Sequence, residues 1–311
     1  RDFNRQGTVL FFIGALRGWH GRYRESVALG TEGVRLGREQ QLVVPLIRCL
    51  WTQGIGYTGL GDYESALGAL REGLSLAEKL GDEGFMCRYL NTLGWLHVEC
   101  GDLDLGLELN ARGLELARRD QHATGAERAA FTLLNEADAF MAKRDLAAAS
   151  EKLGEALQIV KHPPPSRWMT WRYSTHCYAS LGELALARGD PATAAGFADQ
   201  SLAIAVPTRS RKFESRAWRI KGEIAIMRRH WVAAEEALRQ SLAIAQEIDE
   251  PRQLWKSHVS IGRLNRELKR VDAADRSHHA ASEILERLLG NARDPGLRAG
   301  LELQLRGLRE P

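Results

Sequence analysis

The stretch that decides the fold is Gly73-Leu74-Ser75-Leu76-Ala77-Glu78, because related blocks recur along the whole chain. They begin at residues 33, 73, 113, 156, 201, 241 and 281, so the successive steps are 40, 40, 43, 45, 40 and 40 residues. Two copies share the same five residues, Ser-Leu-Ala-Ile-Ala, at 201–205 and 241–245. A fixed period of roughly 20–50 residues is the sequence signature of a repeat architecture. The register therefore predicts seven structural repeats.

A turn signal lies twelve residues before most of these blocks. The pairs Gly61-Asp62, Gly101-Asp102 and Gly189-Asp190 occupy the same repeat position, which Arg144-Asp145 also fills. Glycine adopts the left-handed conformation that ends one helix, and an Asp carboxylate caps the amide groups that open the next. Pro191, directly after Asp190, suits a first helical turn. Each repeat is therefore predicted to be a helix, a tight turn and a second helix.

Small residues recur at one position of each predicted helix. The first helices carry Gly14, Gly54, Gly94, Ala137, Gly182, Gly222 and Gly262. The second helices carry Ser26, Ala66, Gly106, Ala149, Ala194, Ala234 and Ala274. A small side chain at a helix crossing allows the two backbones to approach closely.

This pattern resembles the tetratricopeptide repeat (TPR), whose signature places small residues at the same points of its two helices. The unit here is 40 residues or longer, whereas the standard unit has about 34. Long units of this kind resemble the C-terminal TPR regions of bacterial multidomain signalling ATPases, such as STAND-type regulators and ATPase-linked cyclases. HEAT repeats share the period but lack the Gly-Asp turn in this register. The resemblance implies an all-α fold, an α-α superhelix or TPR-like solenoid.

We predict that residues 1–311 form a single solenoid of about seven repeats and a C-terminal capping helix. The repeats start near residues 7, 47, 87, 130, 175, 215 and 255, and the cap covers residues 295–308. The proline-rich segment at 162–166 falls at an irregular step, and it is either a lengthened loop or a hinge.

Two local patterns conflict with this prediction. Residues 54–59 spell the GxGxxG string of dinucleotide-binding proteins, and the leucines between Leu103 and Leu109 alternate as in a strand. A dinucleotide site needs a preceding strand, and here both segments fall where the repeat predicts a helix. We therefore expect helices at both places and no nucleotide site.

Composition narrows the class of protein. The 311 residues include 44% hydrophobic and 27% charged residues, with a net charge of +3. No apolar run approaches the ~20 residues needed to span a membrane. The four cysteines form no paired motif, so we expect reduced core thiols and a cytoplasmic protein. The chain opens at Arg1 without Met, and we expect it to be part of a longer bacterial protein.

Catalytic motifs are absent from the sequence. It contains no HExxH, no Walker A loop, no GxSxG elbow and no CxxC pair. We therefore expect no enzyme activity, no metal and no cofactor.

The TPR resemblance implies that the first helices line a concave groove in which partners bind. Residues at three positions, about one helical turn apart, should face this groove, and they form a basic ladder with two tryptophans. The candidate partner-binding residues are Arg48, Trp51, Arg88, Asn91, Trp95, His176, Arg216, Arg219, Lys256 and Arg263. Arginine binds carboxylates with two hydrogen bonds, and tryptophan provides a flat apolar contact. The alternative is that these arginines are solvated, because arginine outnumbers lysine 35 to 8.

Three functions are compatible with these features. The first is a non-catalytic sensor or scaffold domain of a signalling or regulatory protein, which binds a protein, a peptide (including an acidic one) or a small effector and acts on upstream domains of the parent chain. The second is a self-assembly module. The third is RNA binding, which the nearly balanced charge and the lack of a continuous aromatic ladder disfavour.

Overall fold

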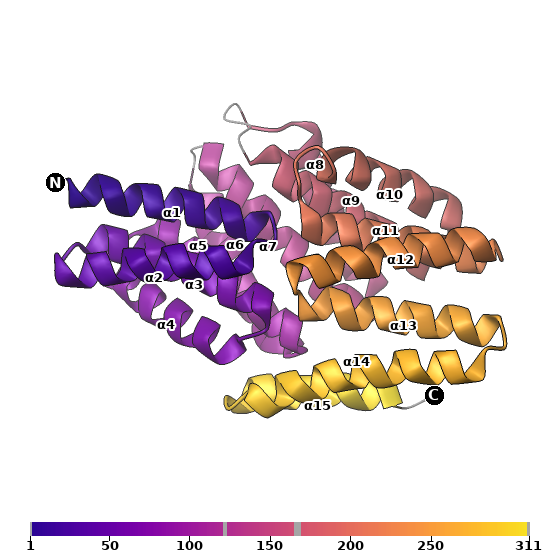
Figure 1. Ribbon diagram of the computed structural model, residues 1–311. Coiled ribbons are helices and arrows are strands. Elements are labelled where there is room, and N and C mark those ends of the chain that lie inside the picture. Colours follow the sequence, from indigo (N-terminus) through magenta and orange to yellow (C-terminus); the bar gives the residue numbers. More distant parts are fainter. Residues whose placement is uncertain (1, 121–122, 165–168, 310–311) are drawn as a thin grey trace.

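The computed structural model describes residues 2–120, 123–164 and 169–309, and in these ranges the chain is helical without strands (Figure 1). The fifteen helices of the described residues are α1 (Phe3–Trp19), α2 (Tyr23–Glu39), α3 (Val43–Leu60), α4 (Tyr63–Leu80), α5 (Glu83–Cys100), α6 (Leu103–Arg119), α7 (Ala123–Ala142), α8 (Leu146–Lys161), α9 (Thr170–Ala187), α10 (Pro191–Ala205), α11 (Arg211–Met227), α12 (Trp231–Ile248), α13 (Pro251–Glu267), α14 (Val271–Asn291) and α15 (Pro295–Arg309). The predicted superhelix of helix-turn-helix repeats with a closing helix is confirmed.

Helices α1 to α14 form seven antiparallel pairs, and each first helix begins a turn or more before the position that the repeat suggested. The GxGxxG string lies inside α3, and the alternating leucines lie in α6, so both are helical as expected. Around the irregular step, α8 ends at Lys161, and the residues at 162–164 are not helical. The rest of the proposed hinge, Pro165 and Ser166, lies outside the described residues.

The turn inside each repeat places one residue in the left-handed region. Glycine fills this position in the first three repeats, with φ of 81° at Gly21, 74° at Gly61 and 89° at Gly101. The fourth, sixth and seventh repeats use basic residues at the same position, with φ of 61° at Arg144, 56° at Arg229 and 57° at Lys269, whereas the fifth has Gly189 at 77°. A residue other than glycine has a steric cost in this conformation, yet three repeats tolerate one, so a second constraint must act on the first three turns.

That second constraint is contact between the two ends of the solenoid. A Cβ atom on Gly21 would lie 2.8 Å from Ile248, and one on Gly61 would lie 2.8 Å from Pro251. Around Gly189 of the fifth repeat, by contrast, nothing lies within 4 Å of such an atom. The superhelix therefore closes on itself, and its early turns leave no space for a side chain.

The last two helices complete this closure (Figure 1). The Glu64 carboxylate at the start of α4 accepts hydrogen bonds from the backbone N–H groups of Arg293 and Asp294, at 2.5 and 2.7 Å. Gly300 of α15 lies against the turn between α5 and α6, where an added Cβ would be 2.6 Å from the carbonyl oxygen of Cys100. The cap thus contacts the third repeat as well as the seventh.

The main apolar core follows this path around the molecule. It runs through the first four repeats and includes Leu96 of α5 together with Leu285, Leu297 and Leu301 of the last two helices. Two smaller clusters in the later repeats are rich in alanine, and Ile220 and Leu238 are among their largest members. All four cysteines are buried and free, as expected for core thiols. Within the described residues, none of the helices has the length and apolar character needed to cross a membrane.

The closure can be tested at α15. We expect Gly300→Ala to lower the free energy of unfolding by about 1–3 kcal/mol, because the new methyl group meets backbone atoms on the α5–α6 turn. Gly307→Ala in the same helix is the matched control, since its Cβ meets nothing within 4 Å, and it should be neutral or stabilising. Urea denaturation compares the two. Equal stabilities would show that α15 does not dock against the turn.

Candidate functional site

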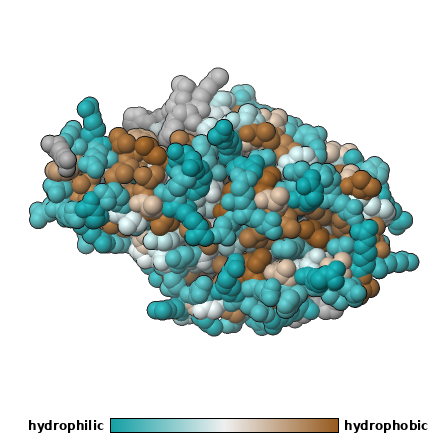
Figure 2. All heavy atoms as spheres, viewed as in Figure 1, coloured by the Kyte–Doolittle hydropathy of each residue, from teal (hydrophilic) through white to brown (hydrophobic). Residues whose placement is uncertain are grey.

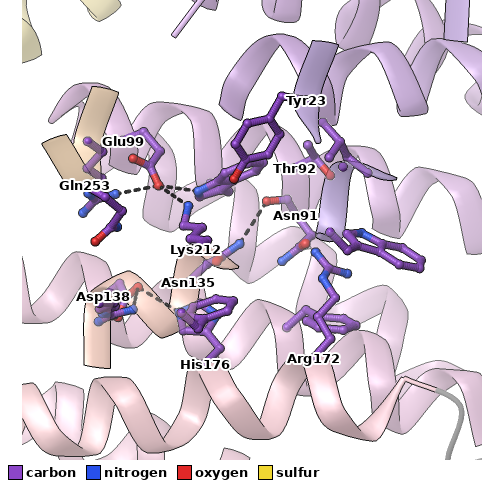
Figure 3. Close-up of a pocket in the computed structure, with 18 of the residues that line it drawn as sticks. Tyr23, Asn91, Thr92, Glu99, Asn135, Asp138, Arg172, His176, Lys212 and Gln253 are labelled. Atoms are coloured by element: carbon purple, nitrogen blue, oxygen red, sulfur yellow. Dashed lines mark hydrogen bonds and ion pairs between the residues drawn. The ribbon is translucent and has the colours of Figure 1, made fainter. Parts of the chain in front are cut away.

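The inner faces of the seven first helices enclose a cavity, here called the central cavity (Figure 3). Its volume is about 80 Å³, which is enough for several water molecules or one small polar group. The lining includes charged side chains from α5, α7, α9, α11 and α13, and aromatic side chains from α1 and α7. Side chains that are more than a hundred residues apart in sequence, such as Glu99 and Lys212, meet there.

Glu99 is at the centre of the first charged cluster. Its side chain is only 4% exposed, and its Oε1 atom lies 3.1 Å from Nζ of Lys212 and 3.0 Å from a guanidinium nitrogen of Arg252. The indole N–H of Trp95 donates to the same oxygen at 2.5 Å. Burial raises the pKa of Glu99, but the two cations outweigh burial and hold this pKa at about 2. The carboxylate therefore stays ionised and ties α5 to α11 and α13.

Asp138 organises the second cluster. One of its oxygens accepts a hydrogen bond from Ser180 at 2.7 Å, and the other lies 2.8 Å from Nε2 of His176. The guanidinium of Arg216 donates to both oxygens, at 2.9 and 3.1 Å, and also donates to Glu183 at 2.5 Å. Burial raises the pKa of Asp138, but Arg216 and His176 together hold it well below its usual range. Asp138 therefore stays ionised, and the cluster joins α7, α9 and α11.

His176 remains neutral at physiological pH in this setting. Its imidazole stacks on Phe213 with ring centroids 4.8 Å apart. Burial lowers the pKa of His176 more than Asp138 raises it. The ring therefore contributes a hydrogen bond to the wall of the cavity, without a charge.

The opposite part of the cavity is aromatic. The guanidinium of Arg172 lies over the Trp19 ring at 4.8 Å and over the Phe131 ring at 4.1 Å, measured to the ring centroids. No carboxylate of the described residues lies within ion-pair distance of Arg172. Burial and the nearby charge of Arg88 lower the pKa of Arg172 to about 9. It is a cation held by aromatic rings alone.

Lys256, on the α13 side of the cavity, also lacks an ion pair with any described carboxylate. Burial lowers the pKa of Lys256 most, and the positive charges of Arg252 and Arg219 lower it further. Glu183 counteracts only part of this, and the pKa of Lys256 falls to about 7. Two of the cations that line the cavity are thus left without a counter-charge.

The structure distributes the ten sequence-predicted residues over three environments. Five line the central cavity, namely Asn91, Trp95, His176, Arg216 and Lys256. Three lie at the other end of the groove, where Arg48 covers Phe11, Arg88 covers Trp51, and Trp51 is a buried core residue. Arg219 pairs with Glu183 beside the cavity, and Arg263 pairs with Glu223 at an exposed position.

Sequence reasoning missed Arg172, Lys212 and Arg252, which line the cavity. Each lies four residues before a candidate at the aligned position, ahead of His176, Arg216 and Lys256 respectively. The signal was therefore available in the register, one helical turn towards the start of each first helix.

In the ranges that the structure describes, there is no group of three His, Cys, Asp or Glu residues placed to hold a metal ion. The buried carboxylates are already neutralised by arginine and lysine, and the cysteines lie in the core. Side chains of this kind can bind and position a ligand through charge and hydrogen bonds.

The sequence profile of the MalT-like TPR region matches residues 12–305. The chain belongs to this family. TPR-type repeats are generally non-catalytic, and they commonly bind proteins or peptides. No curated protein sequence matches the chain significantly.

Two solved structures are similar to this TPR region. The crystal structure of BtubC (BKLC) from P. vanneervenii is 20% identical at a TM-score of 0.51, with 76% of this chain and 92% of that chain covered. This likeness shows the fold alone. The crystal structure of yeast Tom70 is 9% identical, with 98% of this chain and 96% of that chain covered, but its TM-score is only 0.23.

The role of Glu99 can be tested by Glu99→Gln, which removes the carboxylate partner of the buried Arg252 and leaves Lys212 with Glu250 alone. We expect the free energy of unfolding at pH 7 to fall by about 3–5 kcal/mol. The loss should shrink as the pH falls from about 4.5 towards 2, because the wild-type carboxylate itself becomes protonated through its folded pKa of about 2.

The matched control is Glu72→Gln, which breaks an exposed ion pair with Arg38. This change should lower the free energy of unfolding by less than about 1 kcal/mol. Between about pH 4.5 and 2 that loss should also change by less than about 1 kcal/mol. Urea denaturation at several pH values measures both variants. A Glu99→Gln variant as stable as the control would show that the buried cluster does not hold the closed form.

Proposed function

We propose that this TPR region is the non-catalytic effector-binding part of a larger, cytoplasmic bacterial regulatory protein, and that a small ligand occupies the central cavity. The observation that supports this is the convergence of seven first helices on an enclosed space of about 80 Å³. A folded protein does not fit such a space, and a peptide reaches it only by inserting a side chain. The expected groove-binding partner is thereby narrowed to a small molecule.

The position of the charged clusters supports a sensing role. Glu99 both lines the cavity and holds α5 against α11 and α13, and Asp138 does the same for α7, α9 and α11. A ligand that contacts these walls acts on the bonds that close the superhelix. In a solenoid each repeat contacts its neighbours, so a local change in these bonds alters the curvature of the whole array. Upstream domains of the parent chain would respond to that change.

The proposal can be tested by thermal unfolding in two fractions of source-cell extract, the dialysable small molecules and the retained macromolecules. We expect the small-molecule fraction to raise the Tm by several degrees, because a ligand that binds only the folded state stabilises it. Asn91→Phe should abolish this rise, since Asn91 lines the cavity and the ring would fill it. Asn4→Phe, at an exposed position of α1, should leave the rise unchanged.

Stabilisation by the macromolecular fraction alone would contradict the proposal and point to a protein partner instead. If the small-molecule fraction raised the Tm of the Asn91→Phe variant as much as that of the wild type, the ligand would bind outside the central cavity.

Self-assembly is a second candidate, favoured by the outer face of α1 (Figure 2). Apolar side chains gather there over one helix, with Val9 49%, Phe12 50%, Ile13 42% and Leu16 42% exposed. Consecutive turns of exposed apolar residues mark an interaction surface more often than scattered ones do. A second copy of the chain could cover this face.

Sedimentation over a range of concentrations tests this candidate. If α1 mediates assembly, the wild-type mass should rise with concentration, and Ile13→Ser should restore a monomer because it interrupts the apolar face. Val232→Ser, at a position that is 81% exposed on α12, is the matched control and should assemble like the wild type. A wild-type mass that stays monomeric at every concentration would exclude assembly through this face.

A further inference from the structure

The charges that line the central cavity do not balance. Lys212 and Arg252 share Glu99, and Lys212 also pairs with Glu250 at 2.9 Å. Arg216 pairs with Asp138 and Glu183. These three cations therefore have partners inside the protein. Arg172 lines the same cavity without an ion pair to any described carboxylate, so the wall carries uncompensated positive charge there. Lys256 has no such pair either, and with its pKa at about 7 it is partly protonated at neutral pH and gains a full charge when an anion binds beside it.

Arg172 is held in a fixed position by its aromatic neighbours. Trp19 and Phe131 cover the guanidinium group at 4.8 and 4.1 Å, and the side chain rises from α9 towards Asn91 and Thr92 (Figure 3). Rings can bind the faces of a guanidinium, but they leave its in-plane N–H donors unused. The structure gives Arg172 no hydrogen bond to a described acceptor through these donors. A positioned guanidinium with free in-plane donors is suited to an oxyanion, which it binds with two parallel hydrogen bonds.

Neutral polar groups also line the cavity. Asn91 and Asn135 line the cavity, and the Asn135 amide donates to the backbone oxygen of Asn91 at 3.1 Å. Gln253 is 3% exposed, and its side-chain oxygen is buried without a hydrogen-bond partner among the described residues. A buried unpaired oxygen is unfavourable until a donor reaches it. A ligand with a hydroxyl or N–H group would supply one.

We propose that the ligand of the central cavity is a small organic anion, with its carboxylate or phosphate group bound by Arg172 and its charge further balanced by Lys256. This inference rests on the proposed function, which it deepens by naming the chemical class of the effector. The cavity has room for one such group, and the cations beside Glu99 and Asp138 are already paired with carboxylates of the protein. The aromatic end around Arg172 is therefore where the anionic group binds.

The test divides the dialysable fraction of source-cell extract on an anion-exchange resin. The retained anions and the unretained neutral and cationic molecules are added separately, at matched ionic strength, and the Tm is measured. We expect the retained anions to raise the Tm and the unretained molecules to leave it unchanged. Treatment of the retained anions with phosphatase distinguishes the two sources, because a phosphate monoester loses its effect and a carboxylate keeps it.

Arg172→Met is the decisive variant, because methionine keeps an unbranched stem between the two rings and removes the charge. Binding of the active anion should weaken at least about tenfold, as expected for the loss of charge-assisted hydrogen bonds. Without ligand, the variant should be no less stable than the wild type, since the cation has no carboxylate partner. Arg112→Met, at an exposed position of α6, is the matched control and should bind normally.

Arg172→Lys provides a second variant if the first does not fold. It keeps the charge but loses the planar pair of donors, so the anion should bind more weakly than to the wild type. Each outcome decides a different point. A Tm rise with the unretained molecules alone would overturn the anion class and leave the proposed function standing. No rise with either fraction would overturn both, and equal binding to all variants would overturn the role of Arg172.

Discussion

Glu99 is buried on α5, and its charge is balanced by Lys212 of α11 and Arg252 of α13, which lie far along the chain. Glu250 also pairs with Lys212, and two buried cations with two carboxylates cost desolvation energy wherever they are placed. The cluster therefore adds less to net stability than its Coulomb attraction suggests. Its main effect is geometric. Separation of the third repeat from the sixth and seventh would leave Glu99 and Arg252 without their ion pairs, and the superhelix is therefore held in its closed form.

The shape of the turns follows from the same closure. The first three repeats have glycine where the chain turns with positive φ, and atoms of the last repeats fill the space beside Gly21, Gly61 and Gly101. In the fifth repeat the space beside Gly189 is open, and in the fourth and sixth repeats Arg144 and Arg229 occupy the turn position at the cost of an unfavourable backbone conformation. One repeat position thus has two different requirements, depending on whether another part of the solenoid lies against it.

Much of the architecture could be predicted from the sequence. The recurring blocks and the turn pairs established helix-turn-helix units, and the helical assignment of the GxGxxG string and of Leu103 to Leu109 was correct because the repeat register outweighed the local pattern. The site was predicted less well. The repeat register identifies which face of each first helix points inward. Which helical turn on that face lines the cavity depends on how the superhelix curves. The candidates therefore included Trp51, which is core, and omitted Arg172, Lys212 and Arg252, one turn earlier.

The sequence by itself determined the repeat, the positions of the helices and the face that each first helix turns inward, because these depend on contacts between residues close along the chain. Only the tertiary structure decided which charges are paired. Arg216 and Arg172 occupy inward-facing turns of neighbouring first helices, yet Arg216 meets the carboxylates of Asp138 and Glu183 and Arg172 meets only aromatic rings. The pairing is set by the closed curvature, which brings α5, α7, α9, α11 and α13 around one cavity, and it leaves the charge of Arg172 for a ligand.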